Sequence, residues 1–219
     1  MSCTGVILAG GGATRFGGAP KGLELVGGER IIDRVAAALR PVTDELLLVA
    51  NAPNADAWLP GVRRERDLRT GAGALGGLHA ALTHAGGNSI LLVAWDMPFV
   101  PSALLAALRA RGESATERAS GTENAVDAMS TVDAVLPESD GSRRGVEPLC
   151  AWYAPGCLAA VEATLDRDDL RVIGFHDLVR VARFPLDDVR VFGDPAVIFS
   201  NVNTREDLAR SVDAEDSRG

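Results

Sequence analysis

The sequence predicts an α/β fold in which helices cover both sides of a mostly parallel sheet. Continuous apolar runs at 5–8, 45–50 and 90–94 are typical of buried strands. Between the first two runs, apolar residues recur at helical spacing over 31–42, which predicts a helix packed on the sheet. Strands that are apolar along their whole length, alternating with helices, favour parallel pairing with both faces covered.

The first strand leads into a glycine-rich turn, and Arg15, Gly17 and Lys21 follow it. Glycines allow the backbone to approach a ligand closely, and successive backbone N–H groups form a concave anion site. With the two nearby cations, this pattern predicts a polyphosphate-binding loop. The residues whose backbone would surround a nucleotide are Leu8, Ala9, Gly10, Gly11 and Gly12.

Two other glycine-loop patterns fit this stretch less well. A Walker-type loop requires lysine directly after its last glycine, but Gly18 follows Gly17 here. A dinucleotide fingerprint requires a third glycine where Arg15 stands, and an acid after the second strand, where Asn51 stands. A tight turn with solvated basic residues is the remaining structural alternative.

Polar residues follow the next two strands in chain order. Asn51 lies at the carboxyl end of the second strand, where ligands bind in open α/β sheets, so it is a candidate for reading a base or ribose. A strand-ending turn is an equally good interpretation, since Asn51–Asn54 has turn chemistry. A weak third strand over 61–67 ends at Asp67, and a glycine-rich loop then opens a helix at Gly77.

Asp96 follows the buried strand at 90–94. A carboxylate at the carboxyl end of a central strand can hold a divalent metal against phosphate oxygens. The alternative is a helix-capping or turn aspartate.

The remainder of the chain predicts further alternating elements. Residues 112–131 are polar and aperiodic, and are predicted to form a mobile loop. The other predicted elements are helices at 103–111, 155–169 and 170–179, strands at 134–137, 147–153, 189–192 and 196–199, and a last helix that Thr204 caps.

Composition excludes several classes of protein. The chain has 219 residues and a formal net charge of −8, which argues against general nucleic-acid binding. No apolar run reaches the roughly 18 residues of a membrane span, and no signal peptide opens the chain, so a cytoplasmic protein is expected. Cys3, Cys150 and Cys157 lack metal spacing, and the three histidines form no ligand motif and are expected at the surface or on helix flanks.

Several of these motifs together resemble the molybdenum cofactor guanylyltransferases, which are nucleotidyltransferases with a single α/β domain. The matches are Leu8–Gly11 with Arg15, Gly17 and Lys21, then Gly71–Leu78, Asp96–Pro98, Pro148–Tyr153 and Asn201–Leu208. The chain departs from the family pattern at Ala13, Phe16 and Pro20, and Trp95 stands where the family usually has cysteine.

The resemblance implies a Rossmann-like, three-layer fold similar to nucleotide-diphospho-sugar transferases, with one domain over 1–210 and a disordered tail over 211–219. It implies transfer of GMP from GTP to the phosphate of molybdenum–molybdopterin. Asp96 would hold Mg²⁺, Lys21 would stabilise the α- and β-phosphates, and Arg15 would hold the departing pyrophosphate. Nucleotide ligands implied by the family also include Asp67, Gly76 and Gly77.

A protein that delivers molybdopterin, or a molybdoenzyme chaperone, is a further partner that the resemblance suggests. Two alternatives remain open on the residues alone. One is a related cytidylyltransferase or sugar-phosphate nucleotidyltransferase, and the other is a non-catalytic nucleotide-binding module. The retained Arg15, Lys21 and Asp96 argue against the second.

Overall fold

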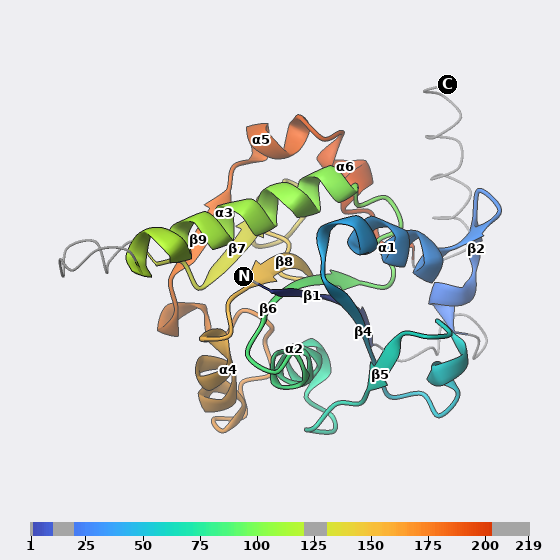
Figure 1. Cartoon of the computed structure of the whole chain (residues 1–219), viewed down its shortest axis with the longest axis horizontal. Coiled ribbons are helices and arrows are strands. Elements are labelled where there is room, and N and C mark those ends of the chain that lie inside the picture. The colour runs from blue at the N-terminus through green and yellow to red at the C-terminus, as the bar shows by residue number, and fades with distance from the viewer. Residues whose placement is uncertain (1, 11–19, 121–130, 203–219) are drawn as a thin grey trace.

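The computed structural model describes residues 2–10, 20–120 and 131–202. In these residues the chain forms three layers, with helices on both faces of a seven-stranded sheet (Figure 1). The strand order is β5-β4-β1-β6-β8-β7-β9. The strands are β1 (Cys3–Ala9), β4 (Glu45–Ala50), β5 (Arg63–Glu65), β6 (Ser89–Ala94), β7 (Ala134–Pro137), β8 (Cys150–Tyr153) and β9 (Val181–Phe184).

The central strand β1 pairs in parallel with β4 on one side and with β6 on the other. All of its residues are buried, since Ile7 faces one hydrophobic cluster while Val6 and Leu8 face the other. This is why its sequence is apolar without alternation. Strand β8 runs antiparallel to both β6 and β7, so the sheet is mixed on that side.

The two helical layers pack on opposite faces of the sheet (Figure 1). One face carries α1 (Ile31–Leu39), α3 (Ser102–Ser120) and two short helices, α5 (Leu186–Arg190) and α6 (Pro195–Ile198). The other face carries α2 (Gly73–His84) and α4 (Cys157–Leu165). A small hairpin, β2 (Leu25–Val26) with β3 (Glu29–Arg30), precedes α1.

Helix α1 forms where the sequence has apolar residues at helical spacing. Its buried residues are Ile31, Ile32, Val35, Ala36 and Leu39, which form one face of a helix. The helix ends at Leu39, and a short 3₁₀ turn over Arg40–Val42 follows. Pro41 lies within that turn, where its missing N–H prevents the α-helix from continuing.

Helix α3 is longer than expected and corrects part of the predicted loop at 112–131. The helix continues to Ser120. Arg109 and Glu113 form an i,i+4 ion pair at 2.9 Å, which supports the helix across the predicted boundary. Gly112 does not end it, because its missing side chain makes room for the ring of Trp152. Residues 121–130, the remainder of the predicted loop, lie outside the described residues.

The segment before residue 200 is also different from the prediction. The predicted strands at 189–192 and 196–199 are wrong, since α5 and α6 occupy this region. Pro195 lies at the first position of α6, and the side chain of Asp194 accepts a hydrogen bond from the N–H of Ala196, which caps the helix. Strand β9 was not predicted, and the predicted helix at 170–179 is only a 3₁₀ turn at His176–Leu178.

Within the described ranges, no helix has both the length and the apolar character that a membrane crossing requires. The predicted last helix from Thr204 and the tail over 211–219 lie outside those ranges.

Candidate active site

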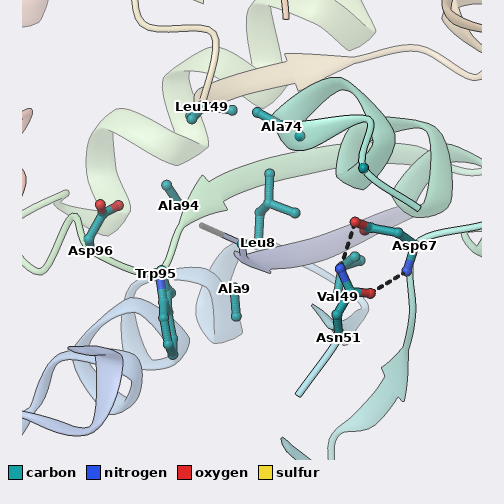
Figure 2. A pocket seen from close by; sticks show the side chains of 13 residues that line it. Leu8, Ala9, Val49, Asn51, Asp67, Ala74, Ala94, Trp95, Asp96 and Leu149 are labelled. Carbon is teal, nitrogen blue, oxygen red and sulfur yellow. Dashed lines mark hydrogen bonds between the residues drawn. The ribbon is translucent and has the colours of Figure 1, made fainter. Parts of the chain in front are cut away.

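An open pocket of about 420 Å³ lies at the carboxyl ends of β1, β4 and β6 (Figure 2). Parallel strands bring their carboxyl ends to one edge of the sheet, and the loops that follow them enclose the ligand site. The pocket is lined by Leu8, Ala9, Gly10, Val49, Asn51, Asp67, Gly71, Gly73, Ala74, Ala94, Trp95, Asp96 and Leu149. The lining includes six of the residues predicted from the sequence: Leu8, Ala9, Gly10, Asn51, Asp67 and Asp96.

Lys21 and Asp96 form an ion pair at this pocket. Lys21 Nζ donates a hydrogen bond to Asp96 Oδ2 at 2.5 Å, and the two side chains are 18% and 14% exposed. Asp96 directly follows β6 and Trp95, while Lys21 starts a 3₁₀ turn. The N–H of Val202 donates to the backbone carbonyl of Asp96 at 3.0 Å, which anchors the loop from the far end of the chain. A cation and a candidate metal ligand therefore meet at one edge of the sheet.

The donor set suits a magnesium ion that is shared with a substrate. Among the described residues, no group of three His, Cys, Asp or Glu side chains could hold a metal ion by itself. Mg²⁺ is usually bound through one or two carboxylates plus substrate phosphates, with waters completing its shell. A single carboxylate at the rim of a nucleotide-sized pocket fits that pattern, and Asp96 is the residue that would provide it.

Asn51 and Asp67 exchange two hydrogen bonds at the opposite end of the pocket (Figure 2). Asn51 Nδ2 donates to Asp67 Oδ2 at 2.7 Å, and the backbone N–H of Asp67 donates to Asn51 Oδ1 at 2.9 Å. The pair connects the loop after β4 to the loop after β5. Asn51, predicted as a base or ribose reader, therefore uses its amide to hold the Asp67 carboxylate in place.

Helix α2 begins at Gly73, not at Gly77 as expected. Gly71, Gly73 and Ala74 contribute to the pocket, so the first turn of the helix faces it. The first N–H groups of a helix have no partner within the helix, and together with the helix dipole they favour an anion. The N-cap residue Ala72 provides no side-chain hydrogen bond to them. The pocket thus contains backbone donors for a phosphate group.

Gly76 and Gly77 do not reach the pocket lining, although the family resemblance assigned them to the nucleotide. Both are buried inside α2. A Cβ atom at Gly77 would overlap Cδ1 of Leu8 on β1, and one at Gly76 would lie 2.8 Å from Cβ of Ala72. Gly77 therefore allows α2 to pack closely on the central strand, whereas Gly76 faces the loop that precedes α2.

The remaining predicted site residues are Gly11, Gly12 and Arg15, which lie outside the described residues, so their roles stay predictions. The sequence singled out the loop at 71–78 but assigned its nucleotide contacts to Gly76 and Gly77, whereas Gly71, Gly73 and Ala74 line the pocket. Leu149 was not predicted as a site residue. Leu149 comes to the pocket because its carbonyl accepts a hydrogen bond from Ala94 at 2.8 Å where β8 joins β6. No local sequence pattern predicts this antiparallel pairing.

The thiols and the buried histidine are not part of this chemistry. Burial raises the pKa values of Cys3 and Cys150, and it raises that of Cys157 to about 12, so these thiols stay protonated and are poor nucleophiles. His79 was expected at the surface or on a helix flank, but it is buried between α2 and α4, with Nε2 3.4 Å from Glu162. None of these four side chains lines the pocket.

Comparison with known proteins identifies the family of this chain. Residues 5–181 match the model of the MobA-like NTP transferase domain. The chain is 36% identical over 219 residues to a probable molybdenum cofactor guanylyltransferase of Pelotomaculum thermopropionicum, covering all of this chain and 96% of the relative. It is 32% identical to the molybdenum cofactor guanylyltransferase of Desulfosudis oleivorans, covering 95% and 93%.

Among solved structures, the molybdopterin-guanine dinucleotide biosynthesis protein A of Archaeoglobus fulgidus superposes with a TM-score of 0.75 at 26% identity, covering 98% of this chain and 99% of that one. The predicted α/β nucleotidyltransferase fold is therefore confirmed. The family match spans most of the chain, and both relatives named above exceed 30% identity over nearly its whole length. The chain belongs to the MobA-like NTP transferase family.

Proposed function

We propose that this chain is a molybdenum cofactor guanylyltransferase, which transfers GMP from GTP to the phosphate of molybdenum–molybdopterin and releases pyrophosphate. The observation that carries the proposal is the meeting of Lys21 and Asp96 at 2.5 Å on the rim of the pocket. The two full-length relatives with that activity in their names support the choice of guanine and of acceptor.

The geometry suggests how the nucleotide would lie. Asn51 and Asp67 form the polar end of the pocket, and a carboxylate there can accept hydrogen bonds from the N1–H and 2-amino groups of guanine. The triphosphate would extend past the backbone of Leu8–Gly10 and the first turn of α2 towards Lys21. The base would thus be read at one end and the phosphates bound at the other.

The reaction needs little covalent chemistry from the protein. An oxygen of the acceptor phosphate attacks the α-phosphorus of GTP in line with the leaving pyrophosphate. No general base is required, because a phosphate acceptor is already ionised at neutral pH. The work of the site is to align the two reactants and to neutralise the charge that builds up between two anions. Lys21 provides a fixed positive charge for the α- and β-phosphates.

Asp96 is the residue that would hold Mg²⁺. When bound there, the ion would polarise the α-phosphate and reduce the repulsion that the attacking anion meets. The ammonium of Lys21 already lies against Asp96, so Lys21 and the ion would both contact the phosphate oxygens.

Calorimetric titration with GTP, CTP, ATP and UTP, each in the presence of Mg²⁺, tests the proposal. We expect clear preference for GTP, and pyrophosphate release from GTP only when molybdenum–molybdopterin is added. Preference for CTP would overturn the guanylyl assignment while keeping the reaction type, and would favour a related cytidylyltransferase. Binding without pyrophosphate release from any nucleotide would favour a non-catalytic module.

A further inference from the structure

The indole of Trp95 lies beneath the pocket, on the side opposite α2. In Figure 2 the ring points away from Ala74 and Leu149, towards the face of the sheet that α1 covers. The residue is 3% exposed although it directly precedes Asp96 at the site. Its ring stacks on that of Trp58, with centroids 5.2 Å apart and planes at 20°. Stacking on Trp58 therefore holds the indole of Trp95 in place.

The Trp95 ring also contacts the backbone of Gly22. A Cβ atom at Gly22 would overlap Cε3 of Trp95 and lie 2.8 Å from Cδ2, so the ring is in direct contact with this α-carbon. Gly22 is the residue after Lys21 in a tight turn, closed by hydrogen bonds from Leu23 N to Pro20 O at 3.0 Å and from Glu24 N to Lys21 O at 3.1 Å. The turn that carries Lys21 thus rests on the Trp95 ring.

We propose that Trp95 is a positioning residue that acts through Gly22: its buried ring, held by Trp58, fixes the turn so that the Lys21 ammonium meets the Asp96 carboxylate. Trp95 and Asp96 are adjacent, so one short segment after β6 sets both partners of the ion pair. The catalytic meaning of the inference rests on the proposed function.

The chain offers a matched control on another part of the fold. Trp152 on β8 is 1% exposed, and a Cβ atom at Gly112 of α3 would lie 2.6 Å from its Cζ3. This is the same contact between an indole face and a helical or turn glycine, but neither residue lines the candidate active site. Trp152→Ala should cost similar packing energy to Trp95→Ala without touching the Lys21 turn.

A first measurement does not require activity. Lys21 is the only lysine in the sequence, so acylation by an N-hydroxysuccinimide ester, followed by peptide mass spectrometry, reports on one side chain apart from the N-terminal amine. Trp95→Ala should raise the acylation rate of Lys21 severalfold, because the turn is released from Asp96. Trp152→Ala should leave the rate at the wild-type value, and Trp95→Phe, which keeps a flat ring, should lie close to wild type.

A second measurement tests whether Trp95 acts through Lys21. Trp95→Ala should lower kcat about 10- to 100-fold with a smaller change in KM for GTP, since small misplacements of a positioned group cost rate. In a Lys21→Ala background the same substitution should lower kcat far less, because the group that it misplaces is already gone. Trp152→Ala should leave kcat unchanged in both backgrounds.

Three results would overturn the inference. One is an unchanged acylation rate of Lys21 in folded Trp95→Ala. If that variant does not fold, a wild-type acylation rate in Trp95→Leu has the same meaning. Another is equal acceleration in Trp95→Ala and Trp152→Ala, which would mean general loosening. The third is a kcat loss from Trp95→Ala that is the same with and without Lys21. If the wild-type protein neither binds nor transfers any nucleotide, the proposed function fails, and the acylation comparison still decides whether Trp95 positions Lys21.

Discussion

The ammonium of Lys21 lies 2.5 Å from the carboxylate of Asp96, although the two residues are 75 positions apart in the sequence. Each neutralises the charge of the other at the rim of the pocket, where both side chains remain partly exposed. An acidic chain with a net charge of −8 must concentrate positive charge locally to bind a nucleotide triphosphate. In the described structure, this pair places a cation beside the carboxylate that we propose as the metal ligand.

Asp96→Asn should remove the dependence of GTP binding on Mg²⁺ and lower kcat by about 10²- to 10³-fold, because an amide oxygen holds a cation weakly and the transition-state charge is then less well neutralised. Calorimetry with and without Mg²⁺ and a pyrophosphate-release assay measure the two effects. Asp187→Asn on α5, where the side chain is 89% exposed, is the control and should match wild type. Full turnover in Asp96→Asn would contradict the metal role.

Lys21→Ala should lower kcat more than it weakens GTP binding, since the ammonium is expected to act mainly on charge that grows during the transfer. Lys21→Arg should restore activity only in part, because a planar guanidinium cannot occupy the position of a compact ammonium. Steady-state kinetics together with a separate GTP titration distinguish the two parameters. Equal losses in kcat and in affinity would indicate simple ground-state binding.

Asn51→Ala should weaken GTP binding about 5- to 10-fold and reduce the preference for GTP over ATP, because Asp67 loses the two hydrogen bonds that orient it. The thermal midpoint should change little, since the pair lies at the surface of the pocket. Asn88→Ala, in the turn before β6, serves as the control. An unchanged GTP/ATP ratio would show that the pair does not orient a base-reading group.

Gly77→Ala should destabilise the protein by about 1 to 3 kcal/mol, because the added methyl group would overlap Leu8 and push α2 away from β1. Urea unfolding measures the change. Gly141→Ala is the matched control, since a Cβ atom there would meet only Ser139 Oγ at 3.8 Å, an ordinary contact. Equal stability of the two variants would contradict the packing role that we assign to Gly77.

His176 should make the protein less stable in mild acid. Burial lowers the pKa of its imidazole from 6.5 to about 4, and the nearby Arg144 lowers it further while Asp177 opposes the shift. Between pH 6.5 and 4 the unfolded chain therefore binds the proton more readily than the folded protein does. The free energy of unfolding should fall as the pH drops through this window, by roughly 1 to 2 kcal/mol for a partly exposed ring.

Urea midpoints at pH 7, 5.5 and 4.5 measure this contribution of His176 to the pH dependence. His176→Asn and His176→Leu should both flatten the dependence relative to wild type, whatever they do to stability at pH 7. Parallel curves for wild type and both variants would mean that another group accounts for the acid sensitivity.

Several elements of the fold could be predicted because they rely on local pattern alone. Strands β1, β4 and β6 are mainly apolar segments, because a strand that is covered on both faces buries the side chains of both faces. Helix α1 has apolar residues at helical spacing and a proline just past its end. Asn51 and Asp96 follow these strands, and both line the pocket because parallel strands bring their carboxyl ends to one edge of the sheet, while their roles there stay predictions.

Other elements could not be predicted because distant contacts decide them. The apolar residues of α5 and α6 suit a strand as well as a helix, and Val189 and Ile198 pack into the core that α1 and α3 share. For α6 a local signal was also available, since Asp194 caps the helix and Pro195 is its first residue. Helix α3 passes Gly112 because Trp152 fills the space beside it.

The sequence by itself determined the fold class and the family, since both depend on periodicity and local motif, and it predicted candidate site residues whose roles stay predictions. Only the tertiary structure decided that Lys21 meets Asp96, that Asn51 holds Asp67, and that Gly77 packs on Leu8 rather than on a nucleotide. The physical reason is that strand order and helix packing, which bring residues from distant parts of the chain within a few ångströms, arise from the burial of whole faces. A single local pattern does not contain that information.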